Sequence, residues 1–351
     1  MTRMTLFKTL PAAAAALLLA QPDAFGHEAW LLTPSEIEDL SRAPIPDLFT
    51  NPVALGIAAL LGGGIAIGAL RVEDRYRTLE ERITAPLTTI ATGLGPVLIR
   101  FGLSLMMILG ALGALPRAGT DPWTQPVLFV PDMQLGLVAG WNWLATVQII
   151  LGAFLILGLA TRLLALGVIA LSVIGLVAFD IHFIAYAPHF IAPALILVVF
   201  GGGWLTMDRL FALPPAPELD PRHLEIAWRT VMVLIGATFV YLGIAYKLFQ
   251  PTLLIAILEH GDFPTFGVPI EIITLAMTGV EIVAGLLLAL GRLVRPVAIF
   301  LIGAFTFFSV MLGETPLFHA NLYGVAAMLL FAGAATPRPL APRHQPALRL
   351  V

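Results

Sequence analysis

Long apolar runs recur along most of this chain, and each is about long enough to cross the hydrocarbon core of a lipid bilayer, which takes about 20 residues of helix. The composition agrees, because 59% of the 351 residues are hydrophobic and only 12% are charged, against about 25% charged in a soluble domain. We therefore predict an all-α, polytopic integral membrane protein with about nine transmembrane helices, at residues 53–70, 94–115, 144–160, 163–180, 187–205, 228–247, 269–290, 296–312 and 317–334.

The N-terminus has the three parts of a secretory signal peptide. Arg3 and Lys8 precede an apolar stretch at 10–20 that is too short to span a bilayer, and small residues follow at Ala24 and Gly26. Cleavage after Gly26 would make His27 the first residue of the mature chain. The polar, acidic residues 27–51 are then expected in the periplasm, with a capped helical turn at 33–42 whose N-cap is Thr33 or Ser35.

Charge placement predicts the orientation of the spans. If the first span runs from outside to inside, fourteen arginines of the mature chain lie at or near the cytoplasmic side, against Arg42, Arg117 and Lys247 outside. This distribution follows the positive-inside rule. We predict a bacterial inner (cytoplasmic) membrane protein with a periplasmic N-terminus after signal cleavage and a cytoplasmic C-terminus.

Net charge and cysteine count exclude several classes of function. The net charge is −3, so no nucleic-acid partner is implied. The chain has no cysteine, which excludes disulfides, thiolate metal sites and dithiol relays. Redox chemistry would therefore need a bound cofactor or metal.

An internal repeat relates the two predicted bundles. VQIILGAFLILGLATR at 147–162 aligns without a gap on VEIVAGLLLALGRLVR at 280–295, an offset of 133. Arg100 pairs with Arg229 at an offset of 129, and His189 pairs with His319 at 130. We predict a tandem duplication of a four-helix unit, with both copies in the same orientation because each has an even number of spans.

The repeated unit has an arginine near its inner end, a helix of the form V-[QE]-I-x-x-G-x-x-L-x-L-G, an arginine turn and a last helix ending in a Gly/Ala patch. It resembles the DoxX-like family over roughly 96–206 and again over 225–335. The resemblance implies a bacterial membrane protein, in some members a subunit of a quinone-linked oxidoreductase. The tandem arrangement, the extra first span and the signal peptide depart from the family's pattern.

These observations divide the chain into seven segments. They are a signal peptide (1–26), a periplasmic segment (27–51), an extra transmembrane helix (52–72), a first DoxX-like unit (94–207), a cytoplasmic linker (208–224), a second DoxX-like unit (225–336) and a cytoplasmic tail (337–351).

Two polar side chains are predicted near the middle of the bilayer. Glu281 lies about twelve residues into its span, and its counterpart in the repeat is Gln148. A charged carboxylate at that depth is costly unless it is paired or protonated. Glu281 is either a proton or quinone contact or a neutral group hydrogen-bonded to another helix. Lys247 is expected to pair with Glu271 at the outer end of the next span.

Five of the seven histidines fall on the predicted outer side, together with several carboxylates. Imidazole suits copper, zinc or iron, and a free amino group on His27 would add a second nitrogen ligand. No tight spacing such as HxH supports a metal site, and histidines in wet loops remain the alternative. The candidate metal ligands are His27, His182, His189, His260 and His319.

The leading hypothesis is a subunit or accessory of a periplasm-facing, quinone-linked redox process, with the lipid bilayer and a membrane redox or assembly protein as partners. The alternatives are a copper- or metal-binding protein of the outer face and a non-catalytic structural or assembly protein. For a quinone, a His or Glu would hydrogen-bond the carbonyl and nearby aromatic rings would contact the ring. The candidate cofactor-binding residues are His189, His319, Glu281 and Gln148.

Overall fold

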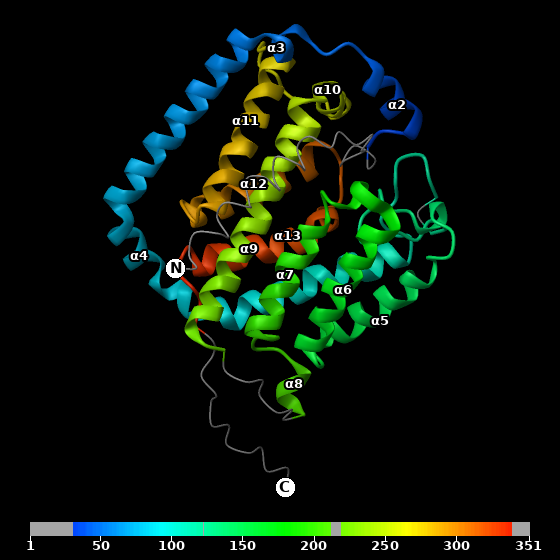
Figure 1. Cartoon of the computed structure of the whole chain (residues 1–351), viewed down its shortest axis with the longest axis vertical. Coiled ribbons are helices and arrows are strands. Elements are labelled where there is room, and N and C mark those ends of the chain that lie inside the picture. Colours follow the sequence, from blue (N-terminus) through cyan, green and yellow to red (C-terminus); the bar gives the residue numbers. More distant parts are fainter. Residues whose placement is uncertain (1–30, 122, 212–218, 339–351) are drawn as a thin grey trace, which may run out of the picture.

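The computed structural model describes residues 31–121, 123–211 and 219–338 (Figure 1). The protein is 75% helical, and the described residues contain no β-strand beyond an isolated bridge between Val127 and Gln134. The predicted all-α class is confirmed. The predicted signal peptide, the cleavage site before His27 and most of the C-terminal tail lie outside the described residues.

The N-terminal segment forms two short helices, α2 (Pro34–Arg42) and α3 (Asp47–Thr50). Thr33 is the N-cap of α2, and it forms a capping box in which its backbone N–H donates to the Glu36 carboxylate at 2.7 Å. Ile37 on the inner face of α2 is fully buried in a small cluster with Leu253 and Ile257. The predicted helical turn at 33–42 is confirmed, and it packs against the second half of the chain.

The next helix, α4 (Pro52–Ala111), is continuous over 60 residues. It joins two segments that we predicted as separate spans, and the polar stretch between them is helical too. Figure 1 shows α4 running along one edge of the molecule and then bending across its centre. Pro86 and Pro96 lie inside the helix, where each removes one backbone hydrogen bond and so permits a bend.

Two sets of helices follow, joined through the short α8 (Met207–Leu210). The first set, after a long loop with the turn η2 (Leu135–Leu137), consists of α5 (Trp143–Leu157), α6 (Thr161–Phe179), η3 (Asp180–Phe183) and α7 (Ala187–Phe200). The second consists of α9 (Pro221–Tyr241), η4 (Leu242–Leu248), α10 (Pro251–His260), α11 (Ile270–Ala289), α12 (Val294–Met311), η5 (Pro316–His319) and α13 (Ala320–Ala332).

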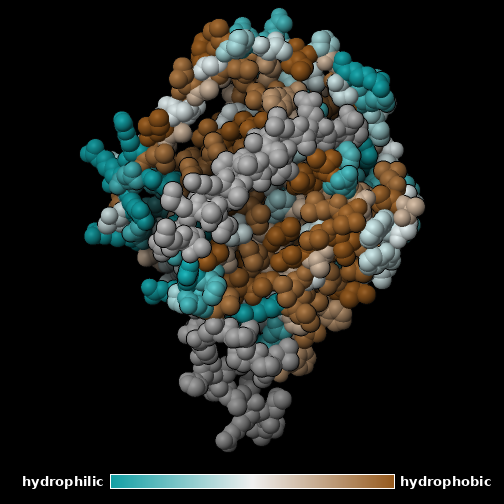
Figure 2. Space-filling model, in the orientation of Figure 1, coloured by the Kyte–Doolittle hydropathy of each residue, from teal (hydrophilic) through white to brown (hydrophobic). Residues whose placement is uncertain are grey.

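Five helical stretches of the described chain are long and apolar enough to cross a membrane. They are Pro52–Ala111, Thr161–Phe183, Pro221–Leu248, Ile270–Ala289 and Val294–Met311. Four further apolar stretches are shorter, at Trp143–Leu157, Ala187–Phe200, Pro251–His260 and Pro316–Ala332. Large apolar side chains such as Leu60 and Val310 are more than 70% exposed, and Figure 2 shows hydrophobic residues over much of the surface. Such a surface suits contact with lipid rather than with water.

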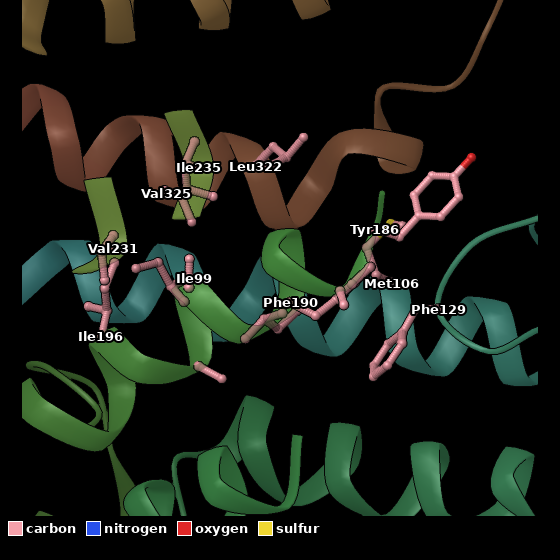
Figure 3. Packing of buried hydrophobic residues seen from close by; sticks show 14 of the residues in the cluster. Ile99, Met106, Phe129, Tyr186, Phe190, Ile196, Val231, Ile235, Leu322 and Val325 are labelled. Carbon is pink, nitrogen blue, oxygen red and sulfur yellow. The ribbon is translucent and has the colours of Figure 1, made fainter. Parts of the chain in front are cut away.

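The core lies where four helices cross (Figure 3). Helix α4 packs along α13, and α7 packs against α9. Ile99 of α4 lies close to Val325 of α13, with Ile196 of α7 and Val231 of α9 nearby. These residues are almost completely buried and belong to one hydrophobic cluster.

Close backbone contact holds α4 against α13. A Cβ on Gly102 would lie 2.1 Å from the carbonyl oxygen of Ala320, and one on Gly324 would lie 2.8 Å from the Cα of Ile99. Only glycine fits at these two positions. The crossing therefore fixes the start of α13, where His319 lies.

Candidate functional site

The most unusual buried side chain in the core is His189, in the first turn of α7. Pro188 occupies the first turn of the same helix, where its missing N–H costs nothing. His189 is 3% exposed, and its Nε2 atom has no hydrogen-bond partner in the described part of the chain. Its backbone carbonyl accepts a hydrogen bond of 3.0 Å from Nδ2 of Asn321 on α13. A buried imidazole nitrogen without a partner carries a free-energy cost, so it is a candidate ligand contact.

A second imidazole lies near the first. His319 ends η5, and its ring stacks on Phe305 of α12 with centroids 4.8 Å apart and planes 13° apart. Phe239 of α9 links the two histidines, since its ring lies 5.9 Å from His189 and 6.3 Å from Phe305. The two imidazoles also interact electrostatically. The structure therefore brings together two of the predicted cofactor residues, on either side of a phenylalanine pair.

An ion pair lies beside His319. Lys247, on the π-helix η4, contacts the carboxylate of Glu281 on α11, and both side chains are mostly buried. Lys247 also interacts electrostatically with His319. We predicted Glu271 as the partner of Lys247, but the structure pairs it with Glu281. Glu281 lies ten residues further along α11 than Glu271, so Lys247 meets the middle of this helix and not its start.

Gln148 lies away from this group. Its side chain is fully buried and bridges the loop before α5, accepting a 2.8 Å hydrogen bond from the backbone N–H of Phe129 and donating one of 2.8 Å to the carbonyl of Val127. Both polar atoms of the amide are therefore used for the fold. Glu281 and Gln148 match in the sequence alignment, but they make different contacts.

Beyond the pair of His189 and His319, the predicted metal ligands join no cluster in the described chain. His182 lies in η3, and His260 ends α10, where it interacts electrostatically with Glu36 on α2. Among the residues that the structure describes, no three histidine or carboxylate side chains are grouped so that they could hold a metal ion. His27 lies outside the described residues.

A partly buried carboxylate lies five residues before His319. Glu314 is in the loop between α12 and η5, and burial raises its pKa to about 7 from an ordinary value of 4.5. The folded protein therefore keeps a proton that the unfolded chain releases between about pH 4.5 and 7. Its contribution makes the folded state less stable as the pH rises through that window, and the loss is complete above pH 7.

Replacing Glu314 with glutamine is expected to remove this pH dependence. The variant should be more stable than the natural protein above pH 7, by on the order of 2 kcal/mol, and about equally stable near pH 4.5. Thermal unfolding in detergent across pH 4.5 to 8 measures the effect. The matched control is Glu259→Gln, an exposed carboxylate at the end of α10. Parallel pH curves for Glu314→Gln and the natural protein would contradict the expectation.

Sequence reasoning missed several residues of the site. Phe239 and Phe305 lie in apolar stretches of α9 and α12, so nothing in the sequence distinguishes them from lipid-facing phenylalanines. Lys247 did carry a signal, because it is a single lysine at the end of an apolar run. We shall call His189, His319, Phe239, Phe305, Lys247 and Glu281 the polar core.

Comparisons with known proteins found no relative of this chain. No protein-family model matches the chain, and neither the curated proteins nor the solved structures gave a significant match.

Proposed function

We propose that this chain is a multi-pass protein of a bacterial inner membrane, built from two DoxX-like four-helix units in tandem, and that it serves as a subunit or accessory of a periplasm-facing, quinone-linked redox process. The observation that carries the proposal is the unpartnered Nε2 of His189, buried beside an aromatic pair and a second imidazole. This set of groups suits a ring that carries hydrogen-bonding carbonyls.

Matching turns in the two halves support the tandem arrangement. Gly158 and Gly291 both have positive φ, of 69° and 68°, and so do Ala160 and Leu293, of 46° and 50°. Within each pair, the two residues are 133 positions apart. A carboxylate caps each turn. Asp208 accepts a hydrogen bond of 3.0 Å from the backbone N–H of Thr161, and Glu73 accepts one of 2.8 Å from the backbone N–H of Leu293.

Helix contacts support the same arrangement. A Cβ on Gly152 would lie 3.3 Å from the carbonyl oxygen of Ser104, and one on Gly285 would lie 2.6 Å from that of Gly236. Gly152 and Gly285 are 133 residues apart, and Ser104 and Gly236 are 132 apart. The contact of α4 with α13 likewise corresponds to that of α9 with α7. A pseudo-twofold axis would exchange these two crossings.

The contacts favour a register that differs slightly from our sequence alignment. Gly158 lies against Arg100, and its counterpart Gly291 lies against Met232, 132 residues beyond Arg100. At this offset Arg100 matches Met232 rather than Arg229. Likewise His189 matches Asn321 rather than His319. The two histidines are then non-equivalent groups that meet near the proposed axis, which allows them different roles.

A chain of side-chain contacts links the polar core to an exposed residue of α12. The ring of Phe305 also contacts Tyr323 on α13, with centroids 5.8 Å apart, and the hydroxyl of Tyr323 is 3.0 Å from that of the exposed Thr306. A bound quinone would take up electrons from a partner redox protein. The residues of this chain would orient its ring between phenylalanines, hydrogen-bond a carbonyl through His189, and hold protons at the imidazoles beside the Lys247–Glu281 pair.

The test is quinone binding by the purified full chain. We expect protein from quinone-producing cells to retain quinone above the level of a detergent-matched blank, measured by chromatography and mass spectrometry of the extract. His189→Ala combined with His319→Ala should lower retention at least about tenfold, whereas the matched outer-side control His182→Ala should keep it. Absence of quinone from the natural protein would overturn the proposal and favour a non-catalytic assembly role.

A further inference from the structure

A cavity of about 420 Å³, lined by no residue of the polar core, lies between the polar middle of α4, α9 and the turn that joins α11 to α12. Figure 2 shows hydrophilic side chains gathered on the edge of the molecule that α4 occupies. The volume falls within the range of about 300–1,000 Å³ that is typical of small-ligand sites. Its charged lining residues are Glu73, Arg77, Glu80, Glu81, Arg229, Arg292 and Arg295.

Four of these charged groups are already engaged in holding α4 to the rest of the molecule. Arg292 contacts Glu73 and Asp74, each at 2.5 Å. Arg295 contacts Glu80 at 2.9 Å and also donates to the carbonyl oxygens of Leu330 and Ala332. Arg292, Arg295, Glu73 and Glu80 line one wall of the cavity, and each of these arginines has at least one carboxylate partner.

Two arginines remain available to a ligand. Arg77 on α4 and Arg229 on α9 have side chains that are 69% and 67% exposed. Each contacts only an exposed glutamate four residues away on its own helix, Glu81 at 3.1 Å and Glu225 at 3.7 Å. Such pairs contribute only about 0.3–0.5 kcal/mol, so they yield readily to a stronger anion. The lining as a whole carries four arginines and three glutamates, an excess of one positive charge, and Glu225 and Asp74 pair with two of these arginines from outside the cavity.

Most of the remaining lining is apolar, and it comes from α4 and α9, from the turn between α11 and α12 and from the residues after α13. Ala85, Met232, Leu290, Val294 and Ala334 are among these residues. A ligand with an anionic head and an apolar body matches a cavity with both kinds of wall. Basic pockets between membrane helices on the cytoplasmic side bind anionic lipid headgroups in this way.

We propose that this cavity binds the phosphate oxyanion of an anionic phospholipid, with Arg77 and Arg229 as its two ligands from different helices. Arginine is suited to the task because its planar fork can donate two hydrogen bonds to one phosphate. A lipid held there would join α4 to α9 at the level of the headgroups. Free inorganic phosphate offers the same oxyanion without the apolar body.

The experiment measures binding of phosphatidylglycerol to the full chain in detergent by native mass spectrometry, with thermal unfolding as the second readout. Arg77→Gln with Arg229→Gln is compared with Arg71→Gln with Arg75→Gln, which removes the same charge from neighbouring positions of α4 that do not line the cavity. We expect the first pair to weaken binding at least about tenfold and to abolish the lipid-induced rise in unfolding temperature. The second pair should change both readouts less than about twofold.

A parallel arm replaces the lipid with inorganic phosphate at the same concentration. If the cavity takes a lipid, phosphate alone should give no comparable stabilisation. Equal stabilisation by phosphate would overturn the lipid assignment in favour of a free-anion site. Equal lipid binding by the two double variants would overturn the site itself. Neither result bears on quinone retention, so this proposal and the proposed function fail independently.

Discussion

Replacing Lys247 with methionine is expected to destabilise the protein by about 3–5 kcal/mol, because the change leaves the carboxylate of Glu281 buried without its partner. Glu281 lies within α11, which is apolar enough to cross a membrane, and an unpaired charge at such a position is costly. The double variant Lys247→Met with Glu281→Leu removes both charges. It should recover most of the lost stability, because replacing a buried ion pair with apolar groups of similar size is often nearly neutral.

Thermal unfolding of the purified variants in one detergent measures this cycle. The matched control is Arg42→Met, which breaks the exposed pair between Arg42 and Glu38 on α2 and should change stability by less than about 1 kcal/mol. A double variant as unstable as the single Lys247 variant would contradict the argument. It would mean that Lys247 stabilises the fold through packing and not through its charge.

The double variant also distinguishes a structural role of the Lys247–Glu281 pair from a role in quinone binding. If the Lys247–Glu281 pair only holds η4 against α11, the double variant should retain quinone as well as the natural protein does. If the pair sets the charge that His319 experiences, quinone retention should fall although stability recovers. Because His319 interacts electrostatically with Lys247, we expect the second result.

Helix content was predictable from the sequence because apolar runs of sufficient length leave few alternatives in a bilayer. The capped turn at Thr33 was predictable for a local reason, since the N-cap and Glu36 lie three residues apart. The continuity of α4 was not predicted. Its polar middle, RVEDRYRTLEER, lies between two predicted spans, yet it contains neither glycine nor proline and is rich in helix-forming residues.

The partners of polar residues were harder to predict than the helices. Gln148 and Glu281 align in the repeat, but the long loop before α5 places backbone groups of Val127 and Phe129 against Gln148, whereas Glu281 contacts Lys247 of η4. Periodicity predicts which residues share a helix face, but it does not predict the rotation of one helix against the next. The proximity of His189 and His319 depends on such a rotation.

Gly102→Ala is expected to be the most damaging small substitution in the core. The new Cβ would lie 2.1 Å from the carbonyl oxygen of Ala320 and 2.7 Å from its carbonyl carbon, and backbone atoms cannot turn aside as a flexible side chain can. Helix α4 and the start of α13 would have to separate. Overpacking of this kind costs about 3 kcal/mol or more, and we expect the unfolding temperature to fall accordingly.

The same substitution should also displace residues of the polar core. Ala320 directly follows His319, and Asn321 holds the backbone carbonyl of His189, so a displaced start of α13 moves both imidazoles. Quinone retention by Gly102→Ala should therefore fall even at temperatures where the protein is folded. The matched control is Gly303→Ala on α12, where a Cβ meets no atom within 4 Å. It should be neutral or slightly stabilising, because alanine is the better helix former. Equal unfolding temperatures for the two variants would contradict the close crossing of α4 and α13 on which the position of His319 depends.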